Sequence, residues 1–286
     1  MNVRIITDSA ADLPRPCRPE VTILPMTVTF GEEQYLDGVD LSHRQFYEKL
    51  IEGDILPTTS QINPAQFEEA FRRCLEAGEQ VVAVVLSSKL SGTCQSARIA
   101  AGEFPGRVFV VDSENAAIGE QILVERALEL MDRGLEAAGI AERLEEEKKD
   151  IRLVALLDTL EYLKRGGRIS PSVALVGGLL SVRPVIAVER GEVVMLGKAR
   201  GSKNGNNLLV QEIRKTGGVD FTRPYLLGYT GLEDSLLQKY IADSAALWEE
   251  HTDALPIGTI GGTIGTHVGP GAVAVAFFRR PDGSGE

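Results

Sequence analysis

Apolar runs and helix-start signals alternate along the first half of the chain. Strands are expected at residues 3–7, 23–30, 80–86 and 108–111. Ser42 followed by Gln45 is typical of a capping box, and Asn63 before Pro64 places a cap ahead of a first-turn proline. We expect a helix after each signal. This alternation predicts an α/β fold with a mostly parallel sheet between two layers of helices.

The pattern changes after the charge-rich stretch at residues 143–150, whose Glu-Glu-Glu-Lys-Lys run is interpreted as a solvated helix end. Further strands are expected at residues 153–157, 182–188, 193–196, 225–229 and 272–278. The second and third of these flank Glu189-Arg190-Gly191-Glu192, which is typical of an antiparallel hairpin. Helices are expected at residues 202–215 and 233–250. The second half is therefore predicted to be α+β, with a mixed or antiparallel sheet.

A chain of 286 residues exceeds the usual size of one domain. We expect an α/β domain over residues 1–150, an α+β domain over 151–280 and a disordered tail at 281–286.

Composition and charge limit the classes of function. Lys and Arg number 30 against 41 Asp and Glu, and the net charge of -11 disfavours a nucleic acid as partner. Cys17, Cys74 and Cys94 have no metal-type spacing and are expected to be free, buried thiols, as in a reducing cytoplasm. Neither a secretion signal nor an apolar run long enough to span a membrane is found, so a cytoplasmic location is expected.

Three segments that we expect to be turns combine small residues with hydroxyls, at residues 58–61, 87–93 and 265–271. Hydroxyls, backbone N–H groups and one histidine can solvate a carboxylate or phosphate, whereas these turns carry no thiol or pair of acids for catalysis. Residues 8–14 and 87–93 both follow strands, so both are expected at the carboxyl edge of the sheet, facing one crevice. The pattern favours binding over catalysis.

Each of these side chains also has a structural interpretation. Thr59 is equally compatible with an ordinary turn hydroxyl, and Ser60 with a cap of the next segment. Ser91 is placed to cap a helix running through residues 95–101, with Gly92 and Thr93 in its first turn. Capping and anion binding are compatible, because a helix N-terminus offers free N–H groups. His267 could be a purely structural histidine.

Two other groups of residues could form sites. Asp8, Ser9 and Asp12 could bind a metal, although carboxylates at this spacing are more typical of a capping turn. The glycines at residues 258–271 match neither the dinucleotide nor the Walker spacing, so packing turns or a backbone that lies close to a ligand are expected. No metal or cofactor is therefore predicted.

A series of short motifs resembles, in order, the landmarks of the DegV family of bacterial fatty-acid-binding proteins. They occur at residues 5–13, 24–26, 37–38, 58–61, 87–93, 111–113, 160–170, 198–201 and 265–271. The resemblance extends over nearly the whole chain. Cys94 stands where an aromatic residue is expected in the family, which affects the expected width of the ligand tunnel.

The resemblance implies that one long-chain fatty acid is held in a tunnel between two domains. The residues implied in binding its carboxylate are Thr59, Ser60, Ser91, Gly92, Thr93 and His267. It also implies a partner, an ATP-dependent fatty-acid kinase that makes an acyl phosphate for phospholipid synthesis. The chain itself would have no turnover and no cofactor beyond the bound acid, and would contact membranes only transiently.

Two basic segments stand out in this acidic chain. The residues that could flank the tunnel mouth and dock the kinase are Arg168, Lys198, Arg200 and Lys203. Scattered surface charge is the alternative.

Two other functions remain open at this point. One is a stand-alone α/β hydrolase, although the chain lacks a Gly-x-Ser-x-Gly elbow and Ser91 has no evident partner other than the remote His267. The other is a module that binds a polar metabolite such as a sugar or a nucleotide.

Overall fold

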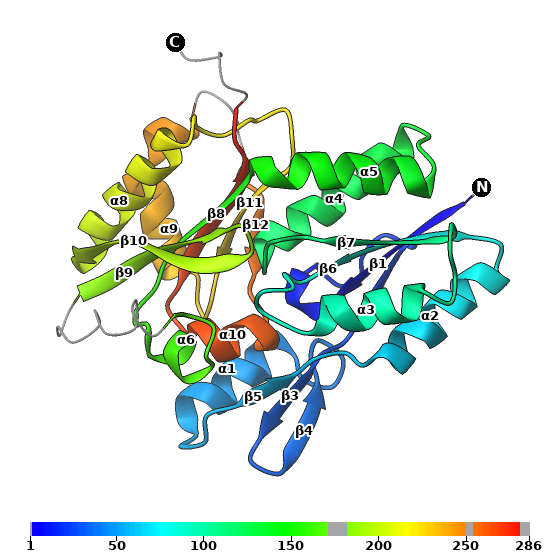
Figure 1. Ribbon diagram of the computed structural model, residues 1–286. Coiled ribbons are helices and arrows are strands. Elements are labelled where there is room, and N and C mark those ends of the chain that lie inside the picture. The colour runs from blue at the N-terminus through cyan, green and yellow to red at the C-terminus, as the bar shows by residue number, and fades with distance from the viewer. Residues whose placement is uncertain (1, 171–181, 250–253, 281–286) are drawn as a thin grey trace.

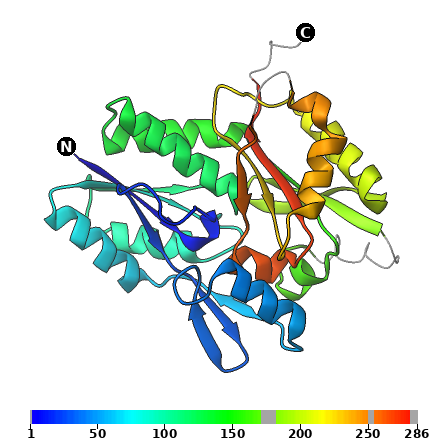
Figure 2. The ribbon, with the colours of Figure 1, turned by 180° about the vertical axis from the view of Figure 1, so that it is seen from behind.

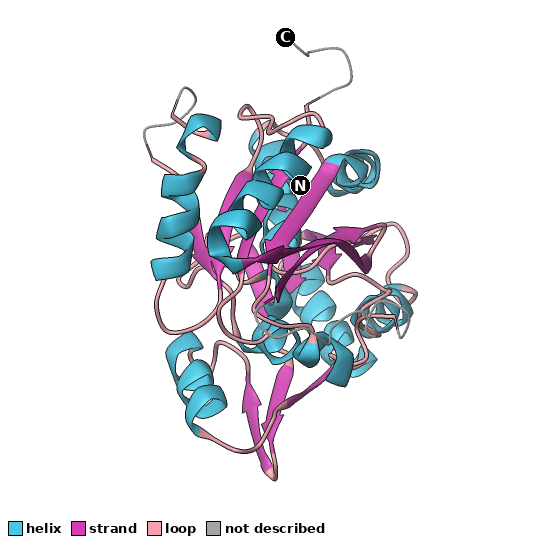
Figure 3. Cartoon of the chain, turned by 90° about the vertical axis from the view of Figure 1, so that its left-hand side faces the viewer, coloured by secondary structure: helices cyan, strands magenta, loops and turns pink. Residues whose placement is uncertain are grey.

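The computed structural model describes residues 2–170, 182–249 and 254–280. The predicted disordered tail, residues 281–286, lies outside the described residues. Two main sheets lie side by side, one built from the first half of the chain and one from the second (Figure 1). A small third sheet projects from the rest of the molecule (Figure 3).

The first sheet is parallel, with strand order β2-β1-β6-β7. Its strands are β1 (Val3–Asp8), β2 (Val21–Leu24), β6 (Gln80–Val85) and β7 (Val108–Asp112). Alternate side chains of its central strands face opposite layers, because successive residues of a strand point to opposite faces. Ile5 and Val82 pack toward α4 (Ile118–Asp132) and α5 (Ala137–Glu147). The other face is covered by α2 (Pro64–Glu76) and α3 (Thr93–Ala101), which confirms the predicted three layers.

Both predicted helix starts in this half are confirmed. Ser42 forms a capping box with Gln45 at the start of α1 (His43–Glu52), and Asn63 does the same with Gln66 for α2. Each pair satisfies backbone N–H groups that a helix leaves free in its first turn.

The prediction of one strand at residues 23–30 is wrong. The run divides into β2 and β3 (Thr27–Phe30), which lie in different sheets. Pro25 has no N–H for a ladder, and the N–H of Met26 donates to the Ser9 hydroxyl instead. The chain therefore leaves the parallel sheet and pairs antiparallel with β4 (Glu33–Leu36) and β5 (Thr58–Ser60). Residues 58–60 are thus an edge strand and not the turn predicted.

The second half forms a six-stranded sheet of order β10-β9-β8-β13-β11-β12. The sheet is mixed, as the predicted α+β class requires. Its strands are β8 (Ile151–Leu156), β9 (Val182–Glu189), β10 (Glu192–Arg200), β11 (Tyr225–Tyr229), β12 (Ile257–Thr259) and β13 (Val273–Phe278). The expected hairpin joins β9 to β10 through Arg190 and Gly191, both at positive φ. Helices α8 (Gly201–Lys215) and α9 (Ser235–Asp243) cover the outer face, as the view from behind shows (Figure 2).

Two predicted segments of this half differ in the structure. The helix expected at residues 233–250 is shorter, because α9 ends at Asp243 and is followed by the 3-10 turn η3 (Ala245–Leu247). Ser244 interrupts it, since its hydroxyl donates to the carbonyl of Tyr240 and accepts from the indole of Trp248. The glycine segment expected to form turns contains β12 and the helix α10 (Gly262–Val268).

The acidic and basic run at residues 145–149 is not simply solvated. After α5, the 3-10 turn η2 (Lys148–Asp150) buries Lys148, whose Nζ donates to the Asp112 carbonyl at 3.0 Å. The same ammonium pairs with Glu114 at 2.9 Å and Glu145 at 2.7 Å. Lys148 is buried because it ties the helix end back to the parallel sheet, which a charge pattern alone does not reveal.

The cysteines are free, with Cys74 and Cys94 buried as expected and Cys17 only half-buried. No helix in the described part of the chain is long and apolar enough to cross a membrane.

Candidate functional site

A cavity of about 380 Å³ lies between the parallel sheet and the six-stranded sheet. Its aliphatic part is formed mainly by β8, β9 and β13, through Leu153, Ala155, Ile186 and Ala274. Ala155 and Ala274 are paired across neighbouring strands. Two such short side chains opposite each other leave the sheet face hollow, which provides room for an apolar ligand.

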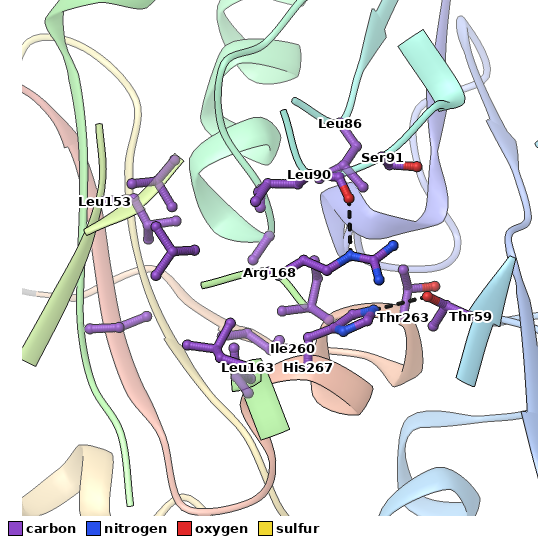
Figure 4. A pocket seen from close by; sticks show the side chains of 18 of the residues that line it. Thr59, Leu86, Leu90, Ser91, Leu153, Leu163, Arg168, Ile260, Thr263 and His267 are labelled. Carbon is purple, nitrogen blue, oxygen red and sulfur yellow. Dashed lines mark hydrogen bonds between the residues drawn. The ribbon is translucent and has the colours of Figure 1, made fainter. Parts of the chain in front are cut away.

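Polar groups gather at one end of this cavity. The polar side chains that line it are Thr59, Ser60, Gln61, Ser91, Arg168, Thr263 and His267. They come from β5 and the residue that follows it, the loop before α3, the segment after α6 (Glu161–Arg165) and α10. In Figure 4, Thr59, Ser91 and Thr263 lie on one side and Leu153 on the other, with Arg168 and His267 between them. Asp and Glu are absent from the described lining, which suits an anionic ligand group.

His267 is held in this wall as a neutral imidazole. Its Nε2 lies 2.9 Å from Oγ1 of Thr59, a contact that joins α10 to β5 across 208 positions of sequence. Its Nδ1 is buried without a partner. Burial lowers the pKa of His267 to about 4, with a further contribution from the positive charge of Arg168. The ring is therefore uncharged at pH 7, with a hydrogen-bonding atom on each side.

Gly166 lies against this histidine. A Cβ placed on Gly166 would come within 2.2 Å of Nδ1 of His267. Only a glycine leaves room for the imidazole at this point.

Arg168, which was expected to flank the mouth of a tunnel, lines the cavity. Its Nε donates to the carbonyl of Leu90 at 3.1 Å, and another nitrogen donates to the carbonyl of Gly166. These backbone contacts fix the guanidinium beside His267 (Figure 4). Arg168 lies at the cavity because the chain turns back toward the cavity after α6. The sequence does not reveal this path.

The Ser91 loop approaches the cavity from the parallel sheet. Gly92, not Ser91, is the N-cap of α3, and no side chain caps that helix start. The Ser91 hydroxyl accepts from the N–H of Thr93 at 3.2 Å and lies 3.0 Å from the Thr93 hydroxyl. A Cβ on Gly92 would clash with Gln61 at 2.1 Å. Ser91 and Gly92 line the cavity, whereas Thr93 is fully buried behind Ser91 and does not.

Residues 8–14 do not face the same crevice as residues 87–93, so that expectation is wrong. Asp8 caps the 3-10 turn η1 (Ser9–Ala11), accepting from the N–H of Ala10 and from that of Leu86, both at 2.9 Å. These bonds tie the two loops together, but Ser9 and Asp12 line a different cavity. No cluster of three or more His, Cys, Asp or Glu suited to a metal occurs in the described residues. The capping interpretation fits this turn.

Helix α10, which carries His267, is positioned by residues from the first half of the chain. Asp37 accepts from the N–H groups of Gly262 at 3.1 Å and Thr263 at 3.0 Å. The Tyr47 hydroxyl donates to the carbonyl of Ile260 at 3.0 Å. The sequence did not indicate this role of Asp37. Its only signal was the Asp-Gly pair at residues 37–38, among the family motifs.

The remaining residues of the basic segments lie away from the cavity lining. Lys198 is on β10, Arg200 ends that strand and Lys203 is in the first turn of α8. Arg200 and Lys203 are exposed, whereas Lys198 is half-buried.

Comparison with known proteins identifies the family. A family model described as "Uncharacterised protein, DegV family" matches residues 2–280. A DegV domain-containing protein of Deinococcus radiodurans is 37% identical over 287 residues, covering 97% of this chain and 98% of that protein.

Solved structures agree in fold. One described as fatty acid binding of a DegV family protein from Thermus thermophilus is 32% identical with a TM-score of 0.86, and covers 97% of this chain and 100% of that one. DegV of Bacillus subtilis, described as a fatty acid binding protein, is 28% identical with a TM-score of 0.82, covering 98% and 100%. The resemblance inferred from the motifs is thereby confirmed, and the chain belongs to the DegV family.

Proposed function

We propose that this protein binds one long-chain fatty acid in the cavity between its two sheets and acts in the cytoplasm as a carrier without turnover of its own. The observation that carries the proposal is the polarity of that cavity. Aliphatic side chains of β8, β9 and β13 line one part, and hydroxyls, an imidazole and a guanidinium line the other, with no carboxylate among the described lining residues. Relatives described as fatty-acid-binding support the assignment.

The hydrocarbon tail supplies most of the binding energy. Burial of one methylene contributes roughly 0.8 kcal/mol, so a sixteen-carbon tail gains on the order of 12 kcal/mol before ordering and docking costs. The polar end then fixes the orientation of the acid.

The carboxylate would be bound by donors at the polar end. Thr59, Ser60 and Ser91 offer hydroxyls, Gly92 offers its backbone, and neutral His267 offers a ring N–H in one tautomer. Thr93, buried behind Ser91, would act by orienting the Ser91 hydroxyl. Arg168 adds positive charge, which reduces the penalty of burying a carboxylate.

The direct test is mass spectrometry of lipid extracted from the protein as purified from cells. We expect one long-chain fatty acid per chain. Recovery of a polar metabolite, or of no acyl chain after incubation with oleate, would contradict the proposal.

A hydrolase can be tested on the same preparation. Ser91 is hydrogen bonded with Thr93, and His267 with Thr59, so the described contacts do not pair this serine with the histidine. A nucleophilic serine needs an adjacent base. We expect no hydrolysis of acyl esters or thioesters.

We further propose that the carrier presents the carboxylate to an ATP-dependent fatty-acid kinase for phospholipid synthesis. Exposed Arg200 and Lys203 are the residues to test as its docking surface. Arg200→Glu and Lys203→Glu should reduce acyl-phosphate formation with little change in fatty-acid affinity. Arg168→Ala serves as the contrast, because a cavity residue should weaken both. Equal loss in both assays for Arg200→Glu would argue against docking at this surface.

A further inference from the structure

The hairpin between β9 and β10 is anchored at its tip to the first half of the chain. Glu189, Arg190 and Glu192 are exposed, whereas Gly191 between them is buried. The carbonyl of Gly191 accepts a hydrogen bond of 2.8 Å from the hydroxyl of Ser87, which is itself fully buried. This contact joins the second half of the chain to the loop after β6, and the fatty-acid proposal leaves it without a role.

Gly191 leaves no room for a side chain. A Cβ there would lie 2.5 Å from Oγ of Ser87, 3.2 Å from Cγ of Lys89 and 3.6 Å from Cα of Glu114. Gly191 also has a φ of 85°, which residues other than glycine rarely adopt. The tip of the hairpin thus fits closely into a socket formed by Ser87, Lys89 and Glu114.

The socket is held together by Asp112 at the end of β7. Its Oδ1 accepts from the N–H of Ser88 at 3.1 Å and from that of Glu114 at 3.0 Å, so it ties the loop after β6 to the loop after β7. Lys148 donates to the Asp112 carbonyl and pairs with Glu114. Because the socket is cross-linked in this way, it fixes the position of the hairpin that enters it.

Both sides of this contact continue directly into walls of the fatty-acid cavity. On the side of the parallel sheet, Leu86 precedes Ser87 and lines the cavity, and the N–H of Ser91 donates to the carbonyl of Ser87 at 3.1 Å. On the other side, Val188 and Val193 line the cavity from the two strands of the hairpin, where they are paired in register. The contact therefore holds the two walls at a fixed separation.

The hairpin valines belong to the aliphatic end of the cavity. Val188 is paired with Leu153 of β8. In Figure 4, Leu153 lies across the cavity from Thr59 and Ser91. A fatty acid with its carboxylate at the polar end would therefore place its tail against this wall.

We propose that Ser87 and Gly191 are positioning residues for the acyl tail, because their contact sets the width of the aliphatic end and so determines how strongly long chains are favoured over short ones. The inference rests on the proposed fatty-acid binding. A gap of about 0.5–1 Å between apolar atoms forfeits a quarter to a half of their attraction. Loosening this wall therefore weakens a long acid most, since a short acid held at the polar end reaches the wall least.

Displacement of a fluorescent fatty acid by palmitate and by octanoate tests the proposal, because the two acids share a carboxylate and differ in tail length. Ser87→Ala removes the hydrogen bond without adding an atom, and Gly191→Ala forces the tip out of its socket. We expect each variant to bind palmitate about tenfold more weakly than the wild type, and octanoate less than about twofold more weakly. In the double variant the palmitate loss should be smaller than the product of the two single losses, because the hydroxyl that the new Cβ meets is gone.

Gly134→Ala and Ser244→Ala are the matched controls. Gly134 has the same φ of 85°, but a Cβ there would meet nothing within 4 Å. Ser244 is a buried serine whose hydroxyl donates to a backbone carbonyl away from the cavity lining. Both controls should bind the two acids as the wild type does.

Equal fold losses for palmitate and octanoate in Ser87→Ala and Gly191→Ala would overturn the inference and leave fatty-acid binding intact. Palmitate affinity no lower than in the controls would do the same. Should Gly191→Ala fail to fold, the comparison of Ser87→Ala with Ser244→Ala decides the matter alone. A wild type that binds neither acid would overturn the proposed function, and this inference with it.

Discussion

His267 shows how one residue depends on contacts that are remote in sequence. Its ring lies between Thr59 of β5, to which it is hydrogen bonded, and Gly166, which follows α6. Arg168 adds a nearby positive charge. Both burial and that charge disfavour the imidazolium form. The sequence predicted that His267 belongs to the binding site. Its neutral state, however, follows only from these neighbours.

The lowered pKa of His267 predicts a pH dependence of stability. A histidine with a pKa of about 4 when folded and an ordinary value of 6.5 stabilises the fold fully above pH 6.5. That contribution is lost as the pH falls toward 4, because the unfolded chain then binds the extra proton. Urea unfolding at pH 7 and pH 5 should show that the wild type loses on the order of 2 kcal/mol more stability than His267→Gln between these two pH values. A parallel pH dependence in both proteins would contradict this assignment.

Gly166 predicts a second effect at the scale of a single residue. Gly166→Ala would push the imidazole away from Thr59, because the new Cβ would lie 2.2 Å from Nδ1. We expect fatty-acid affinity to fall about tenfold, measured by titration with a fluorescent fatty acid.

Gly139→Ala in α5 is the matched control, since its Cβ would meet nothing closer than 3.9 Å. It should leave fatty-acid affinity unchanged and stabilise the helix by roughly 0.5–1 kcal/mol. The same affinity loss in both variants would show that Gly166 does not act through His267.

At the scale of elements, α10 is the helix that determines where His267 lies. It is formed by seven residues of the second half of the chain, yet Asp37 and Tyr47 from the first half fix its start. Gly265 lets it approach α1, where a Cβ would come within 2.6 Å of Phe46. A glycine-rich sequence does not predict this helix, because its stability comes from these partners more than from its own propensity.

Removal of the Asp37 cap should therefore affect both stability and binding. Asp37→Ala leaves the N–H groups of Gly262 and Thr263 without their acceptor, and we expect a loss of about 2 kcal/mol in unfolding free energy. Fatty-acid affinity should fall as well, because α10 carries His267.

Asn63→Ala removes a comparable cap from α2, away from the cavity lining. It should reduce stability by about 1 kcal/mol while leaving affinity unchanged. Urea unfolding and fatty-acid titration of both variants check the pair, and unchanged affinity in Asp37→Ala would mean that the cap does not position His267.

At the scale of the whole molecule, the ligand space depends on how two sheets meet. Ala155 and Ala274 are adjacent in register on β8 and β13, and both face the cavity. Nothing in the sequence distinguishes either alanine from other core residues, since small apolar residues are common in buried strands. Only the pairing of strands more than a hundred residues apart turns them into the wall of a cavity.

This geometry predicts a change in ligand length. Ala274→Leu would fill part of the aliphatic region, so mass spectrometry of extracted lipid should show shorter acyl chains than in the wild type. Val275→Leu, whose side chain belongs to the core on the other face of the sheet, should lower stability by about 1–3 kcal/mol without changing chain length. An identical lipid profile in Ala274→Leu would place the tail elsewhere.

The amino-acid sequence by itself determined most strands and helices, because hydrophobic period and capping signals such as Ser42 with Gln45 are local. It also indicated hydroxyls, among them those of Thr59 and Ser91, that line the cavity. Tertiary structure alone decided that Arg168 lines the cavity, that Asp37 caps α10, and that residues 8–14 and 87–93 serve separate spaces. These relations join positions far apart along the chain, and the burial that fixes charge and hydrogen bonding exists only once the sheets have packed.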